Sequence, residues 1–233
     1  MADYPVLITG SNRGIGLAMV KSYLKDNYNI IATCREPENA TELSDLQSDY
    51  KQQLDVVALD VGSAVQRQKL SEQLAKTPLD SLISNAGVYG GHQQTFGEID
   101  EDIWLDTLKI NAIAPLMLSQ LLLPNLLKGK QKTIAMLSSK MGSIDDNSYG
   151  HAYIYRSSKT ALNSVVKSMS IDLKKDAVRV LALHPGWVRT DMGGAGGLID
   201  VDESVAGLRQ TIDRSSLDDS GRFFAYDGVE IPW

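Results

Sequence analysis

The chain has one cysteine and three histidines among its 233 residues. The single cysteine, Cys34, excludes an internal disulfide and is typical of a protein from a reducing compartment. Because His92, His151 and His184 show no ligand-like spacing, we expect no metal site. The longest apolar stretches, such as LLLPNLL, are too short and too interrupted to span a bilayer, so we expect no membrane association.

Basic residues are outnumbered by acidic ones, 23 against 29, which gives a net charge of -6. A nucleic-acid partner would favour a basic surface, so we expect none. The opening MADYPVLITG has no basic segment followed by an apolar one, which predicts no signal peptide and a cytoplasmic protein. With 43% hydrophobic residues, the chain can fill one core, and we expect residues 1–233 to form a single domain.

The chain is rich in short runs of β-branched and aliphatic residues. Most are continuously apolar, which predicts strands that are buried on both faces. The runs lie at residues 5–9, 29–33, 54–59, 81–84, 133–137, 178–183 and 223–225. Segments with helical spacing separate them, most clearly at 157–175. This alternation predicts an α/β fold of Rossmann type, a doubly wound parallel sheet flanked by helices on both faces, with ligands at the strand carboxyl ends.

The first predicted strand is followed directly by TGSNRGIG, residues 9–16, and then by a helical pattern. Glycines at positions 10, 14 and 16 remove side chains where the backbone must turn and approach a ligand. The free amides at the start of the next helix form a site for an anion. The stretch predicts phosphate binding, and a tight strand-to-helix turn without a ligand is the alternative.

The second predicted strand ends in IIATCREP. An NAD site would need a carboxylate here to bind the ribose 2′-hydroxyl. Cys34 and Arg35 occupy this place, and Arg13 lies in the glycine-rich loop. Each arginine taken singly is equally well an ordinary surface residue. Two guanidinium groups at one corner suit a 2′-phosphate, so together they favour NADP(H) over NAD(H).

The stretch YIYRSSK, residues 153–159, contains two tyrosines and ends in a lysine. On a helix Tyr155 lies over Lys159, whereas Tyr153 faces elsewhere. A phenol loses its proton near pH ~10, and a neighbouring ammonium lowers that pKa. The pair therefore predicts an acid–base group near neutrality. On this pair alone, the alternative is a surface tyrosine beside a solvated lysine.

Taken together, the motifs resemble those of the short-chain dehydrogenase/reductase family over essentially the whole chain. In the order of that family they are TGSNRGIG, LDV at 59–61, NAG at 85–87, KINA around Asn111, LSSKMG at 137–142, YRSSK at 155–159 and HPGWVRTDM at 184–192. Two shorter stretches, TDMGG at 190–194 and the terminal YDGVEIPW, resemble the branch of C-factor and sniffer-type carbonyl reductases.

The resemblance implies that the matching positions bind NADP(H). In the first half of the chain these are Gly10, Ser11, Arg13, Gly14, Ile15, Gly16 and Arg35, with the two arginines on the 2′-phosphate. On the adenosine they are Asp60, Val61, Asn85, Ala86 and Gly87, and on the nicotinamide Pro185, Gly186, Val188 and Thr190. Structural alternatives remain: Asp60 could cap a helix and NAG could be a plain turn.

The resemblance also implies a catalytic set of Asn111, Ser139, Tyr155 and Lys159. In reduction, Tyr155 would give its proton to the carbonyl oxygen as hydride arrives from the nicotinamide. Lys159 would lower the phenol pKa and bind the nicotinamide ribose, so both residues would also contact the cofactor. Ser139 would orient the carbonyl. We choose it over Ser138 because the family's serine precedes x-x-G, as in SKMG.

A proline gives a second reason to single out Asn111. In a helix the carbonyl of residue 111 accepts from the amide of residue 115, which here is Pro115 and has no amide hydrogen. The helix should kink, and the freed carbonyl could hold a water that passes protons toward Lys159. A plain proline kink is the alternative.

The implied activity is NADPH-dependent reduction of a small or medium carbonyl compound, an aldehyde, ketone or quinone. An NADP-dependent alcohol dehydrogenase and a dinucleotide-binding signalling protein with little turnover are the alternatives. In the family, the helices that carry Asn111 and Tyr155 often pack against a second subunit. A homodimer is therefore possible, although these apolar helix faces could equally serve the core.

Overall fold

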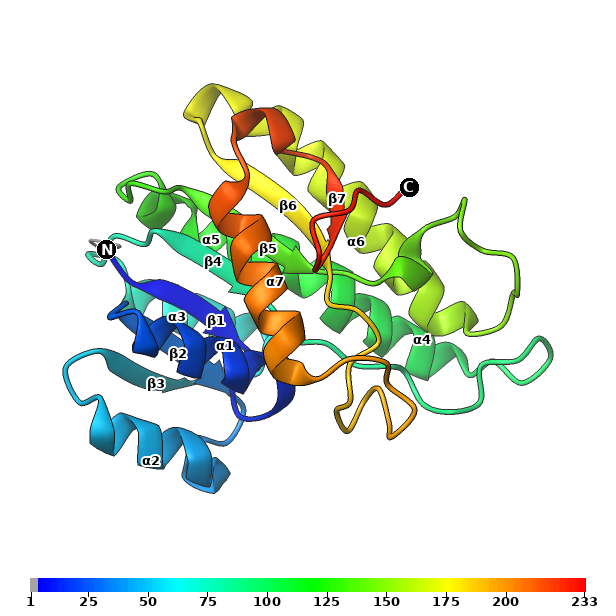
Figure 1. Cartoon of the computed structure of the whole chain (residues 1–233), viewed down its shortest axis with the longest axis horizontal. Helices are drawn as coiled ribbons and strands as arrows, with labels where there is room; N and C mark the ends of the chain where they lie inside the picture. Colours follow the sequence, from blue (N-terminus) through cyan, green and yellow to red (C-terminus); the bar gives the residue numbers. More distant parts are fainter. Residues whose placement is uncertain (1–3) are drawn as a thin grey trace.

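The computed structural model describes residues 4–233, which form a seven-stranded sheet between two layers of helices (Figure 1). The strands are β1 (Val6–Thr9), β2 (Ile30–Cys34), β3 (Leu54–Ala58), β4 (Ser81–Ser84), β5 (Thr133–Leu137), β6 (Arg179–His184) and β7 (Phe223–Ala225). Their spatial order is β3-β2-β1-β4-β5-β6-β7, and every neighbouring pair is parallel. Each predicted run forms a strand, so the predicted doubly wound parallel sheet is confirmed.

Helices lie on both faces of the sheet. Within residues 4–233 the α-helices are α1 (Gly14–Lys25), α2 (Thr41–Asp49), α3 (Ala64–Gln73), α4 (Glu101–Leu108), α5 (Ala114–Leu126), α6 (Tyr153–Asp172) and α7 (Val201–Arg214). Shorter helical turns are η1 (Pro37–Asn39), η2 (Lys109–Ile113), η3 (Lys140–Gly142), η4 (Lys174–Asp176) and η5 (Leu217–Asp219). Helices α1, α2 and α7 cover one face, and α3, α5 and α6 cover the other (Figure 1).

The two cores explain why the strand sequences are continuously apolar. Along β1, Val6 and Ile8 pack into the core under α1 and α7, whereas Leu7 packs into the core under α5 and α6. Successive side chains of a strand point to opposite faces, so a strand covered on both faces needs apolar residues at every position. The chain starts at β1, places β2 and β3 on one side of it, and then returns to place β4 to β7 in order on the other side.

The helix predicted to kink near Asn111 contains a π-helical turn. Between α4 and α5, the Ala114 amide donates to the Lys109 carbonyl, one residue further back than in an α-helix. This π-helical turn, Lys109–Ile113, contains Asn111, where the proline was predicted to disturb the helix. By length and composition, the continuous helix 101–126 could cross a membrane. Its Leu118 and Leu122 are fully buried in the core between the sheet and helices α3, α5 and α6, which is the arrangement of a core helix.

Helix α6 begins four residues before the predicted 157–175 and ends three residues earlier. The residues just before it, His151 and Ala152, both have a left-handed backbone, with φ of 54° and 50°. Neither is a glycine or an asparagine, the residues that favour this conformation. The beginning of α6 therefore depends on contacts from elsewhere in the chain.

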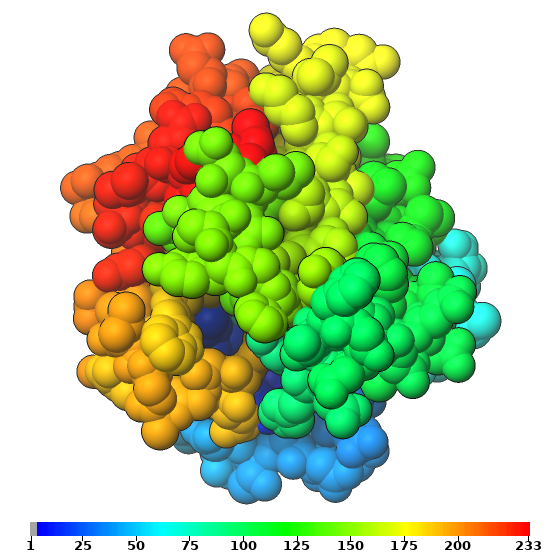
Figure 2. Space-filling view, turned by 90° about the vertical axis from the view of Figure 1, so that its right-hand side faces the viewer, coloured from blue at the N-terminus to red at the C-terminus, as the bar shows by residue number. Residues whose placement is uncertain are grey.

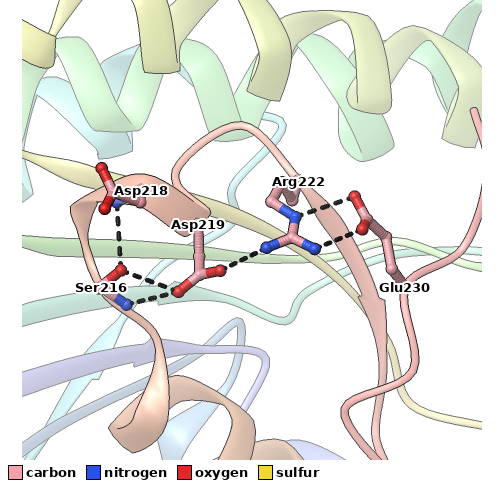
Figure 3. A network of polar contacts seen from close by, with 5 residues as sticks. All are labelled: Ser216, Asp218, Asp219, Arg222 and Glu230. Atoms are coloured by element: carbon pink, nitrogen blue, oxygen red, sulfur yellow. Dashed lines mark hydrogen bonds and ion pairs between the residues drawn. The ribbon is translucent and has the colours of Figure 1, made fainter.

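At the far edge of the sheet, a surface network ties η5 to the segment that follows β7 (Figure 3). Asp219 accepts from the Ser216 amide at 2.8 Å and from the Ser216 hydroxyl at 3.0 Å. Arg222 donates to Asp219 at 2.6 Å and to both carboxylate oxygens of Glu230. The guanidinium thus joins two acidic side chains across the surface.

Candidate active site

The predicted site residues gather at one edge of the sheet, where the parallel strands have their carboxyl ends. The glycine-rich loop follows β1, residues 60–61 follow β3, residues 85–87 follow β4, and residues 185–190 follow β6. Figure 2 shows a hollow at the molecular surface, bordered by the orange segment after β6, the light-green loop before α6 and the teal loop after β4. Dark-blue atoms from the N-terminal part of the chain lie at its base.

The glycine-rich loop has the close backbone contacts that a phosphate cradle requires. Gly10 has φ of +68°, and a Cβ on Gly16 would lie 2.2 Å from the Gly10 carbonyl oxygen. Asn85 locks the loop, because its side-chain amide donates to the carbonyls of Thr9 and Gly10 at 2.9 Å each. No side chain caps the first turn of α1. Its amides are thus free for an anion, so the loop fits a dinucleotide diphosphate.

Two neighbouring predicted contacts have structural bonds of their own. Ser11 is fully buried, and its hydroxyl donates to the Ile8 carbonyl at 2.8 Å, so the side chain braces the loop. Asp60 accepts from the Gly62 amide at 2.9 Å, which shapes the turn after β3 rather than capping a helix. Ser63 is the cap of α3.

The two arginines expected at the 2′-phosphate are exposed. Arg35 follows β2 directly. Arg13 forms an ion pair with Asp191, so the pair ties the glycine-rich loop to the segment after β6. These two segments also approach one another where Gly14 faces Thr190, whose methyl carbon would lie 3.6 Å from a Cβ on the glycine.

The segment after β6 is held in place by its own contacts. Gly186 has φ of +86°, and a Cβ there would lie 2.5 Å from the Ile199 side chain. The Pro185 carbonyl accepts from Ser204 at 2.5 Å, and Val188 is buried. These contacts fix the wall at which the nicotinamide is expected.

Tyr155, Lys159 and Ser139 come together between β5 and α6. The Lys159 ammonium lies 5.7 Å from the centre of the Tyr155 ring and donates to the Leu137 carbonyl at 2.8 Å. Ser139 acts on the Tyr155 phenol and opposes the rise of its pKa. Ser138, the alternative, donates instead to Asn163 at 2.6 Å within the core.

Burial changes the acid–base properties of both groups. It raises the pKa of Tyr155 to about 12, against an opposing hydrogen bond from Ser139. Burial also lowers the pKa of Lys159 to about 8. The prediction that the lysine brings the phenol pKa toward neutrality is therefore wrong for this structure, because desolvation outweighs any attraction to the amine. The phenol is protonated at neutral pH.

Asn111 is buried and fully hydrogen-bonded. Its Oδ1 accepts from the Val88 amide at 2.9 Å, and its Nδ2 donates to the Val88 carbonyl at 2.8 Å and to Ser158 at 2.9 Å. Ser158 in turn donates to the Tyr155 carbonyl at 2.8 Å. Asn111 thus holds the chain after β4 against the helix that carries Tyr155.

The model of the short-chain dehydrogenase family matches residues 5–196. The chain belongs to the short-chain dehydrogenase family. It is 44% identical over 156 residues to C-signal of Myxococcus xanthus, an alignment that covers 67% of this chain and 93% of C-signal. The predicted membership of an oxidoreductase family is confirmed.

Solved structures place the dehydrogenase in the predicted branch. Carbonyl reductase Sniffer of D. melanogaster superposes with a TM-score of 0.94 at 35% identity, over 99% of both chains. The NADPH-bound carbonyl reductase from chicken fatty liver has a TM-score of 0.92 at 36% identity, over the full length of both. The resemblance to C-factor and sniffer-type reductases is thus confirmed.

The structure of the dehydrogenase adds neighbours of Tyr155 that sequence reasoning missed. The ring of Tyr89 lies against the ring of Tyr155, with centroids 4.8 Å apart. Tyr89 lies two residues after the NAG motif, and this position could have indicated from the sequence that it lies near the site. Gln94 contacts the backbone of Tyr155, and nothing in the local sequence indicates this. Trp104 on α4 donates to Ser157 on α6 at 2.8 Å.

A cavity of about 270 Å³ lies beside α7 and β7. Its lining includes Thr211, Arg214, Phe224 and Asp227, and no predicted site residue. The hollow at the strand ends is therefore the candidate active site of this dehydrogenase.

Proposed function

We propose that this chain is an NADPH-dependent reductase of a small or medium carbonyl compound, an aldehyde, ketone or quinone, with Tyr155 as the proton donor. The observation that carries the proposal is that the buried amine of Lys159 lies 5.7 Å from the centre of the Tyr155 ring, with the buried Ser139 at the end of the neighbouring strand β5. A donor pair next to a cation is what a carbonyl oxygen needs as negative charge develops on it.

Support for NADP(H) comes from the glycine-rich loop and from the relatives. The loop leaves room and free amides for a diphosphate, and the chicken relative is described as NADPH-bound. Arg13 and Arg35 would hold the 2′-phosphate, and Pro185 to Thr190 the nicotinamide. When bound, NADPH supplies a hydride to the carbonyl carbon.

The residues of the chain supply the proton and hold the charge. Tyr155 donates its phenolic proton to the substrate oxygen, which Ser139 orients by a hydrogen bond. The high pKa of Tyr155 keeps the phenol protonated before the reaction. The phenolate left behind lies near the Lys159 ammonium, whose charge stabilises it. The relay from Asn111 through a water remains a prediction.

The test is NADPH oxidation with a panel of aldehydes, ketones and quinones. Tyr155→Phe should lower kcat by about 10²–10⁴-fold, because it removes the proton donor and keeps the ring. Tyr153→Phe is the matched control, since that tyrosine lies two residues away and is exposed, and it should leave kcat unchanged. Undiminished turnover by Tyr155→Phe would refute the mechanism.

A dinucleotide-binding signalling protein is the second candidate, because the relative of 44% identity bears the name C-signal. Tight NADPH binding without turnover of any compound on the panel would favour it. An NADP-dependent alcohol dehydrogenase would instead show faster turnover with alcohols and NADP⁺ at the same pH. A homodimer and a cytoplasmic location stay predictions.

A further inference from the structure

The first turn of α6, which carries Tyr155, has no cap of its own. Its N-cap residue, Ala152, has no side chain that can accept a hydrogen bond. The first bond within the helix runs from the Arg156 amide to the Ala152 carbonyl at 2.8 Å. The amide of Tyr155 therefore has no partner within the helix. The preceding left-handed residues add backbone strain at the same point.

A glutamine from a distant loop supplies the missing acceptor. Gln94 is 4% exposed, and its Oε1 accepts from the Tyr155 amide at 2.9 Å. Its Nε2 donates to the Tyr89 carbonyl at 2.8 Å and to the Gly91 carbonyl at 3.0 Å. The oxygen accepts from one amide and both N–H groups donate to carbonyls, so the side chain forms three of the four hydrogen bonds open to it.

The loop that carries Gln94 is pressed against the start of α6 at several other points. The Tyr89 ring contacts the Tyr155 ring, and the rings of Phe96 and Tyr153 lie 6.2 Å apart. Gly90 has φ of +86°, and a Cβ there would lie 2.5 Å from the Ile154 side chain. The loop backbone thus lies directly on the helix, and Gln94 is the polar group that fixes both.

We propose that Gln94 is a positioning residue, which holds the start of α6 so that the phenol of Tyr155 faces Ser139 and the substrate. The proposal rests on the proposed reductase function. Without the side-chain amide of Gln94, the backbone N–H of Tyr155 and the carbonyls of Tyr89 and Gly91 lose their partner. The phenol of Tyr155 is then no longer held in one place. Small displacements of a reacting group slow the chemical step strongly. The KM for NADPH should change less than kcat, because the glycine-rich loop follows β1 and is held by Asn85, whereas the hydrogen bonds of Gln94 are to residues 89, 91 and 155.

The first test compares Gln94→Met, which keeps the length of the side chain, with Gln93→Met, a substitution at the exposed neighbour. We expect kcat of Gln94→Met to fall about tenfold or more, with the KM for NADPH within about twofold of wild type. The isotope effect with NADPH deuterated at the transferred position should increase, since the chemical step becomes slower. Gln93→Met should match wild type in all three.

The second test needs no turnover. Hydrogen–deuterium exchange should show lost protection at residues 153–156 in Gln94→Met and unchanged protection at residues 166–172. Gln94→Glu keeps an acceptor for the Tyr155 amide, but its second carboxyl oxygen would face the Tyr89 and Gly91 carbonyls. Protection at 153–156 and part of kcat should therefore return only at a pH at which the carboxyl is protonated and donates to one of these carbonyls. This pH dependence tests the proposal if Gln94→Met does not fold.

The outcomes separate the two proposals. Unchanged exchange in Gln94→Met would show that Gln94 does not cap α6. Lost protection with an unchanged kcat and isotope effect would reduce Gln94 to a structural cap, and either result overturns its positioning role. No turnover by the wild type would overturn the reductase function itself. Turnover by the wild type with equal rates for the two methionine variants would overturn only the role of Gln94.

Discussion

Two polar networks in this molecule have opposite characters. In the first, at α6, Asn111 and Ser158 are almost completely buried, and Lys159 beside them is 5% exposed. None of the side-chain contacts described for these residues is to a carboxylate. In the second, at the sheet edge, Arg222 binds two carboxylates with roughly half of its side chain exposed (Figure 3).

The two networks differ in burial and in charge pairing, and this difference distinguishes a surface contact from a group that serves the reaction. A buried cation without a counter-ion costs free energy, as the lowered pKa of Lys159 shows. An exposed ion-pair network costs little and contributes little. The costly arrangement lies at the strand carboxyl ends, beside the hollow, and the inexpensive one lies far from it. A buried cation with no carboxylate among its described contacts therefore marks the candidate site.

The largest effect is expected inside the buried network, at Asn111. Asn111→Ala removes three hydrogen bonds and leaves both polar groups of Val88 without their partner. The free energy of unfolding should fall by about 4 kcal/mol, since each buried group left unpaired costs about 1–3 kcal/mol. Denaturant unfolding measures this loss. A loss below about 1 kcal/mol would show that the network is not closed as described.

The next effect comes from the charge of Lys159. Its lowered pKa means that the unfolded chain binds this proton at a higher pH than the folded protein does. Stability is therefore lost as the pH falls toward 8. Lys159→Met should gain about 2 kcal/mol relative to wild type between about pH 9.5 and about pH 7.

Unfolding of both proteins across this pH range, without cofactor, measures the difference. Lys167→Met is a suitable control, because this lysine is exposed on the same helix. A stability difference that stays constant with pH would mean that Lys159 keeps an ordinary pKa and that the contrast between the two networks is not electrostatic.

The fold was predictable because its signals are local. Apolar runs predicted all seven strands, and most are continuous because a strand buried on both faces needs an apolar residue at every position. The edge strand β3 is the exception, with Asp55 exposed. The glycine-rich loop was equally readable, because close approach of the Gly10 and Gly16 backbones excludes any Cβ. Both follow from residues that are neighbours in sequence.

The features that the sequence did not predict depend on contacts between distant segments of the chain. The start of α6 was placed four residues late, because its cap comes from Gln94, 61 residues before Tyr155. The phenol pKa was predicted to fall, since spacing shows the nearby lysine and not the burial around both groups. The partner of Arg13, Asp191, lies 178 residues further along the chain. Helical spacing and motif order carry no information on any of these.

A smaller effect is expected at the exposed ion pair of Arg13 and Asp191. If Arg13 binds the 2′-phosphate, Asp191 competes with the cofactor for the guanidinium. Asp191→Asn should then tighten NADPH binding about threefold and leave NADH binding unchanged, because exposed pairs contribute at most about 1 kcal/mol. Titration of each cofactor at low and high salt measures this. Weaker NADPH binding by the variant would instead mean that the pair closes the hollow over the cofactor.

The smallest effect is expected in the surface network, at Glu230. Glu230→Gln removes the negative charge of one of the two partners of Arg222, which keeps its bond to Asp219 at 2.6 Å. Both Arg222 and Glu230 are largely solvated, so water and salt replace most of what the ion pair supplies. The melting temperature and kcat should stay within experimental error of wild type. A loss of stability comparable to that of Asn111→Ala would show that exposure does not separate the two networks, and the argument from buried charge to active site would fail with it.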